Sequence, residues 1–213
     1  MKFREATAAL RDTVQQSARA YHARNTLAAE SFRETEGEPH RGRRVAHATA
    51  HILASMPIRI RPGEILVGWH PSSHLDEDAQ QELNDANAYL RAQNYWVSAS
   101  EGHMGLDYPS ILRDGLGAIS ARIDELAAAL SPVDAATPER QAFYQSARTS
   151  IDACQSLIRR YADLARETSA TADDLEWQAE LRDIADVCDR IATEPATTFQ
   201  DAVQLMWFTF LAV

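Results

Sequence analysis

Hydrophobic residues in this chain recur mostly at three- and four-residue steps, the spacing typical of amphipathic helices. The clearest case starts at Thr137-Pro138, where an N-cap hydroxyl precedes a proline suited to the first helical turn. One predicted apolar face comprises Phe143, Ala147, Ile151, Cys154, Ile158, Tyr161 and Ala165. The next helix, expected over residues 174–192, carries Leu181, Ile184, Cys188 and Ile191. Both faces must pack against other parts of the protein.

The first half of the chain also favours helices, with more interruptions. Residues 2–32 contain no Gly or Pro and are rich in good helix formers, which predicts one or two helices. A further helix is expected from about Arg43 to Met56, ended by Pro57. Another is expected from Pro109 to about residue 130, in which Gly115 and Gly117 indicate close backbone packing.

Between these helices the spacing changes to alternation. Ile58 and Ile60 precede a Pro62-Gly63 pair, and Ile65 and Val67 follow it. This pattern predicts a short β-hairpin near residues 58–68. The polar stretch over residues 70–85 is interpreted as a loop that passes into a helix, and residues 99–108 as irregular.

The final segment is unusually apolar for the end of a chain. Thr198 and Asp201 indicate the capped start of a helix, and eight of the last nine residues, 205–213, are apolar. Gln204 and Asp201 come too soon for a membrane span of about 20 apolar residues. Because a terminus is usually polar and wet, we expect the chain to continue into a buried core that this sequence lacks.

Composition narrows the function classes. The chain has 213 residues, which is long enough to bury a core, and a net charge of −10, which disfavours nucleic acid and anionic membranes. No apolar run follows the basic residues at the start, so a secretory signal is not supported and a cytoplasmic location is expected. Cys154 and Cys188 are too few for a disulfide framework and are interpreted as core residues, not nucleophiles.

Several stretches, taken in order, resemble the N-terminal region of glycyl radical enzymes of the pyruvate formate-lyase type. Each is weak alone, and their order and spacing along nearly the whole chain make the combination specific. The stretches lie at residues 30–39, 43–46, 51–53 and 56–68, at Gly102-His103 and Asp107-Tyr108, and at residues 143–147, 160–162, 180–185 and 198–204.

The resemblance implies that residues 1–213 are the helical N-terminal part of a pyruvate formate-lyase-type domain, with its α/β barrel incomplete at the C-terminal end. It implies a mainly α chain. The family stores a radical on a glycine, installed by an activating enzyme that uses an iron-sulfur cluster and S-adenosylmethionine. That radical oxidises a cysteine, which attacks a small polar organic substrate. Both residues are expected beyond residue 213, so no catalytic residue and no directly bound cofactor are expected in this chain. The full-length form is expected to be a homodimer.

Three residues are predicted to bind substrate in the complete enzyme. His103 lies in an irregular, Gly-flanked loop, and the resemblance assigns it contacts to substrate hydroxyls, which a neutral imidazole can make. Periodicity alone places Asp152 on a solvated surface. The resemblance instead suggests a carboxylate that faces the barrel interior, and Tyr144 shares both interpretations.

The sequence also bears on a candidate metal site and on two hypotheses for function. His47 and His51 have a spacing that can bind zinc, but the Glu of an HExxH motif is missing, and the other histidines complete no metal set. The leading hypothesis is the N-terminal fragment of a radical lyase, acyltransferase or dehydratase, inactive alone. The alternative is a stand-alone helical protein that binds a partner through its apolar C-terminal helix.

Overall fold

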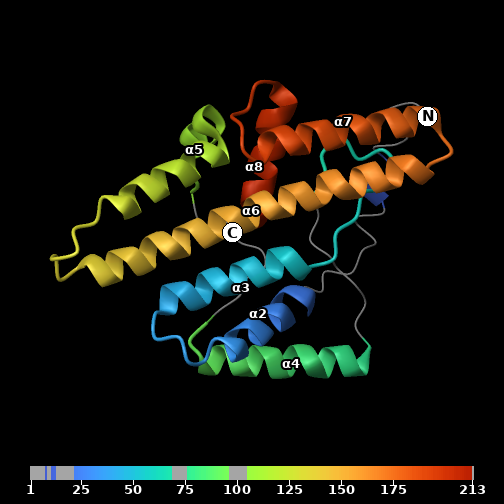
Figure 1. Cartoon of the computed structure of the whole chain (residues 1–213). Coiled ribbons are helices and arrows are strands. Elements are labelled where there is room, and N and C mark those ends of the chain that lie inside the picture. The colour runs from blue at the N-terminus through green and yellow to red at the C-terminus, as the bar shows by residue number, and fades with distance from the viewer. Residues whose placement is uncertain (1–7, 9–10, 13–21, 69–75, 96–104, 213) are drawn as a thin grey trace.

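The computed structural model describes residues 8, 11–12, 22–68, 76–95 and 105–212. Within these ranges the chain is mainly helical (Figure 1). The helices are α2 (His22–Glu34), α3 (Arg41–Ser55), α4 (Glu77–Ala92), α5 (Tyr108–Ala128), α6 (Thr137–Thr171), α7 (Leu175–Ile191) and α8 (Phe199–Ala212). The helices predicted from periodicity are therefore confirmed where the chain is described, with ends shifted by a few residues.

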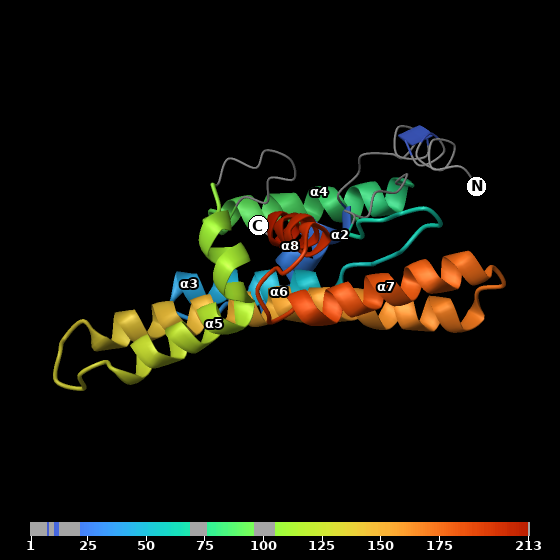
Figure 2. The same cartoon turned by 90° about the horizontal axis from the view of Figure 1, so that it is seen from above.

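Helix α6 is the long central element of the structure. It contacts α3, α5, α7 and α8, while α2 packs against α3 and α4. Helix α5 lies beside the first half of α6, and α7 lies beside its second half (Figure 1). Helix α8 contacts α5, α6 and α7, and in the view from above it appears between α4 and α6 (Figure 2).

The hydrophobic core gathers where these helices meet. Tyr161 of α6 is fully buried and its ring centroid lies 5.2 Å from that of Phe208 on α8. The predicted faces of α6 and α7 are buried over most of their length, including Cys154, Ile158, Ala165, Leu181, Ile184, Cys188 and Ile191. Each of the described helices is either too short or too polar for a bilayer span.

The predicted apolar face is wrong at the start of α6. Phe143 is 67% exposed, whereas its neighbour Ala142 is buried. Here Ser146 Oγ lies 3.4 Å from the place where a Cβ on Gly42 of α3 would stand, and Ser146 shares a helix face with the buried Ala142. Helix α3 therefore meets α6 on that face. The predicted N-cap is also wrong, since Ala136 precedes the helix and the Thr137 hydroxyl donates to the Ser131 carbonyl.

The predicted β-hairpin near residues 58–68 is wrong. The turn at Pro62-Gly63 forms, and the Glu64 N–H donates to the Arg61 carbonyl at 3.1 Å, but the described residues 57–68 contain no strand. On the second arm, Ile65 is exposed whereas Val67 is fully buried, so the two residues that a strand would place on one face lie in different environments. Both backbone groups of Val67 instead bond to a side chain of α8, so this arm is held by a helix.

The two glycines of α5 do mark a close backbone approach, as predicted. Gly115 has φ of +75° inside the helix and produces a kink. A Cβ on Gly115 would lie 2.5 Å from the Glu194 carbonyl carbon. The Gly117 N–H donates to the Thr193 carbonyl at 2.8 Å, so the kink seats α5 on the segment between α7 and α8.

Candidate functional site

The structure places two of the three predicted substrate-binding residues on α6 and does not describe the third. His103 lies outside the described residues. Asp152 is exposed, and Arg148 Nε donates to its two carboxylate oxygens at 3.0 Å each. Arg148 also pairs with Asp124 of α5, so one guanidinium joins the two helices. In this chain Asp152 is an acid in a surface ion-pair network.

Tyr144 is half-buried and lies edge-on to the ring of Phe143, with centroids 5.6 Å apart. Eight residues separate Tyr144 from Asp152, which is about 12 Å of helical rise. These two side chains therefore cannot hold one small molecule from adjacent turns. Their contact with substrate stays a prediction that depends on protein beyond the described helices.

A polar junction between α8 and residues 67–68 is the first arrangement that the sequence did not reveal. Gln204 Oε1 accepts from the Val67 N–H at 2.8 Å, and Gln204 Nε2 donates to the Val67 carbonyl at 2.6 Å. Trp207 Nε1 donates to the Gly68 carbonyl at 2.6 Å. The available signal was a glutamine within an apolar run, because a buried amide needs hydrogen-bond partners.

The start of α8 is fixed by a buried carboxylate. Asp201 is fully buried and accepts from Arg190 Nη2 at 2.6 Å and from the amides of Thr197 and Thr198 at 3.0 Å. In return, the Asp201 N–H donates to the Thr198 hydroxyl at 3.0 Å, which completes the reciprocal cap that the sequence predicted. Burial alone would raise the pKa of Asp201, but the bonds from Arg190, Thr197 and Thr198 hold that pKa well below its usual range.

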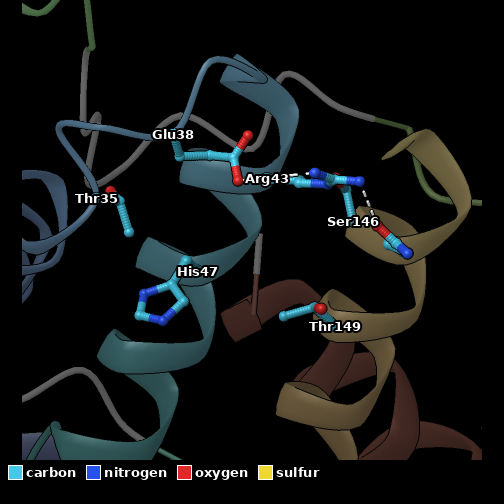
Figure 3. Close-up of a pocket in the computed structure, with 7 residues that line it drawn as sticks. Thr35, Glu38, Arg43, His47, Ser146 and Thr149 are labelled. Atoms are coloured by element: carbon cyan, nitrogen blue, oxygen red, sulfur yellow. Dashed lines mark hydrogen bonds and ion pairs between the residues drawn. The ribbon is translucent and has the colours of Figure 1, made fainter. Parts of the chain in front are cut away.

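A cavity of about 270 Å³ opens where the end of α2, the start of α3 and the first half of α6 meet (Figure 3). All of its lining residues have polar side chains: Thr35, Glu38, Arg43, His47, Gln145, Ser146 and Thr149. Arg43 Nη2 donates to Gln145 Oε1 at 2.6 Å, and Arg43 Nη1 lies 3.7 Å from Glu38 Oε2. The cavity thus contains one fixed cation beside one fixed anion. Sequence analysis missed it because its residues come from three separate segments.

The two cysteines are buried, and His47 and His51 each lie beside a polar side chain. Cys154 and Cys188 are buried, and burial raises the pKa of each thiol to about 12, so neither is a ready nucleophile. His47 Nδ1 lies 3.1 Å from the Ser31 hydroxyl, and His51 Nε2 lies 3.1 Å from Glu30. Within the described ranges, no three His, Cys, Asp or Glu side chains gather closely enough to hold a metal ion.

Comparison with known proteins shows which class of protein has this arrangement of helices. Over 128 residues the chain is 34% identical to the isethionate sulfite-lyase of Nitratidesulfovibrio vulgaris. This matched stretch is 60% of this chain and 14% of the relative. The glycerol-bound, B12-independent glycerol dehydratase of Clostridium butyricum superposes with a TM-score of 0.79 at 25% identity, over 89% of this chain and 31% of that one. A glycyl radical enzyme from Archaeoglobus fulgidus shares the fold over the whole chain, with a TM-score of 0.81 at 24% identity.

These relatives are glycyl radical enzymes, among them a lyase and a dehydratase, and the helices described here correspond to one part of them. Residues 69–213 match the family described as pyruvate formate lyase-like. The chain therefore belongs to the pyruvate formate lyase-like family. It spans 34% or less of the length of each of these three relatives.

Proposed function

We propose that this chain is the N-terminal helical part of a glycyl radical enzyme, where it forms one wall of the substrate pocket and is inactive alone. The observation that carries the proposal is the family match over residues 69–213, together with the superposition of 89% of the chain on about a third of the glycerol dehydratase. The reaction would be radical elimination or cleavage of a small polar substrate, as a lyase, acyltransferase or dehydratase.

The exposed face of α8 supports this proposal. Phe199, Trp207 and Phe210 are 86%, 37% and 41% exposed, and the Trp207 and Phe210 rings stack with centroids 5.7 Å apart. Neighbouring faces of the same helix carry Leu205, Phe208 and Leu211 in the core. A helix that is apolar all round is usually buried on all sides, so we infer that further polypeptide covers the outer face.

In the complete enzyme a glycyl radical would be installed by a partner with an iron-sulfur cluster and S-adenosylmethionine. His103 would contact substrate hydroxyls, and Tyr144 and Asp152 would contribute if the remaining protein turns this part of α6 toward the pocket. For Asp152 this requires release from Arg148, since both carboxylate oxygens are bonded there. The complete enzyme would be a cytoplasmic homodimer.

The decisive test begins with the reading frame past the codon for Val213. We expect it to continue to a loop with a cysteine and to a glycine near the end. The whole polypeptide, treated anaerobically with its activating enzyme, should show the electron paramagnetic resonance doublet of a glycyl radical. It should then turn over one of isethionate, glycerol or propane-1,2-diol, and His103→Ala should lose turnover while keeping the radical signal.

A stop codon after Val213, with a defined oligomer or partner complex formed through α8, would instead support the stand-alone interaction protein. If the His103→Ala variant formed the glycyl radical and kept full activity, the proposed enzyme function would stand and the role proposed for His103 would be wrong. The Tyr144→Phe and Asp152→Asn variants test the other two residues in the same way.

A further inference from the structure

The cavity between α2, α3 and α6 holds two opposite charges whose arrangement selects for one kind of ligand. Its cation, Arg43, and its anion, Glu38, lie 3.7 Å apart at Nη1 and Oε2 (Figure 3). That distance is a charge contact and too long for a hydrogen bond. Donor hydrogens on Nη1 and lone pairs on Oε2 therefore remain for another molecule.

Other bonds hold both charged groups in place. Arg43 Nη2 is anchored on Gln145 Oε1 at 2.6 Å, and Glu38 Oε1 accepts from the His40 N–H at 2.8 Å. The two side chains are about one third exposed, so a ligand can reach them from solvent while most of each side chain stays covered by protein. Preorganised groups of this kind cost a ligand little ordering entropy when it binds.

We propose that this cavity binds a small α-amino acid as its zwitterion. A simple anion would be attracted by Arg43 and repelled by Glu38. A simple cation would be attracted by Glu38 and repelled by Arg43. A carboxylate and an ammonium on one carbon are attracted by both, with the carboxylate on Arg43 Nη1 and the ammonium on Glu38 Oε2. The proposal does not rest on the proposed function.

The remaining lining residues set the size and polarity of the side chain. The cavity volume of about 270 Å³ leaves room for a short side chain beyond the two charged groups. The Ser146 hydroxyl donates to the Ala142 carbonyl at 2.7 Å and can accept from a ligand, Thr149 adds a second hydroxyl from α6, and His47 lines the cavity from α3 (Figure 3). These groups favour a small hydroxylated side chain, so L-serine is the probe of choice.

The test is calorimetric titration of the whole polypeptide that the gene encodes with L-serine, acetate and methylamine. We expect saturable binding of L-serine and affinities at least about tenfold weaker for acetate and methylamine, since each keeps one charge contact only. Arg43→Gln and Glu38→Gln should each weaken L-serine binding by about tenfold or more. Arg159→Gln and Glu167→Gln, which change exposed charges elsewhere on α6, should leave it unchanged.

Circular dichroism establishes that each variant is folded. Should either charge variant fail to fold, Thr149→Leu fills the cavity without removing a charge and should abolish binding. The proposal is overturned if L-serine shows no saturable binding, if acetate or methylamine binds as tightly as L-serine, or if the folded cavity variants bind it as the unchanged protein does.

Discussion

Asp201 is the residue whose chemistry is most completely determined by its surroundings. Its carboxylate is fully buried and is bonded by Arg190, by two amides and by the Thr197 hydroxyl. A buried carboxylate is tolerated when its partners are charged or preorganised donors, as these are. The pKa of Asp201 is consequently lowered, which links the stability of the α7–α8 connection to pH.

Asp201→Asn should cost about 3 kcal/mol of unfolding free energy at neutral pH, because it removes the charged partner of Arg190. The folded-state pKa lies below the unfolded value of about 4, so the carboxylate stabilises the protein fully above that value. This contribution is lost as the pH falls through the folded-state pKa. Urea unfolding at a series of pH values should show the difference between the proteins shrinking below about pH 4. A gap that is constant with pH would contradict the linkage.

Asp163→Asn provides a matched control. The Asp163 side chain is 69% exposed and pairs with Arg166 on the surface of α6. Exposed pairs of this kind contribute about 0 to 1 kcal/mol. The control should therefore unfold at nearly the same urea concentration as the unchanged protein.

Gln204→Leu tests the second buried polar residue of α8. The leucine fills similar space but leaves the Val67 N–H and carbonyl without their partner inside the protein. Leaving such groups unsatisfied should cost about 2 to 4 kcal/mol, measured from the urea midpoint with an unchanged m-value. Gln141→Leu, at an exposed position, should change the midpoint little. Equal effects of the two substitutions would show that the Val67 bonds do not stabilise the fold.

At the scale of elements, the helices could be predicted from the sequence, whereas the conformation of the segment over residues 58–67 and the contacts between helices could not. The apolar steps of α6 and α7 carry their own signal, since burial of one face every 3.6 residues is a local pattern. Residues 58–67 alternate as a strand does, yet no strand forms among them, because Gln204, 137 residues away, takes the backbone groups of Val67. The capping pair Thr198 and Asp201 could be predicted, whereas the cavity around Arg43 depends on how three helices meet.

Gly115→Ala should disrupt the kink in α5. A Cβ there would meet the backbone of Glu194 at 2.5 Å, and φ of +75° is strained for alanine. We expect a loss of at least about 2 kcal/mol, measured by chemical unfolding. Gly37→Ala is the matched control, because nothing lies within 4 Å of the place of its Cβ. If both substitutions had the same small effect, α5 would not be seated on the 193–195 segment as described.

At the scale of the whole molecule, the outer face of α8 remains uncovered by the described residues. An exposed aromatic pair of this kind should bind a hydrophobic dye in the isolated 213-residue chain. Trp207→Ser combined with Phe210→Ser should lower that dye fluorescence markedly. Val133→Ser, at a position that is 92% exposed in the loop after α5, should leave it unchanged. If the unchanged protein and both variants bound the dye equally, the dye-binding hydrophobic surface would not be the outer face of α8.

The hydrogen bonds between α8 and the first third of the chain also bear on how the protein folds during synthesis. The Arg24 guanidinium donates to the Leu211 carbonyl across 187 residues, and Gln204 holds Val67 across 137. Such distant closures are slow, and a nascent chain emerges at about 5–20 residues per second. At the upper rate, the 187 residues from Arg24 to Leu211 take about nine seconds and the 137 residues from Val67 to Gln204 about seven, so α2 and the Val67 segment emerge well before their partners on α8. Chaperones that bind exposed hydrophobic surfaces should be needed most in that interval.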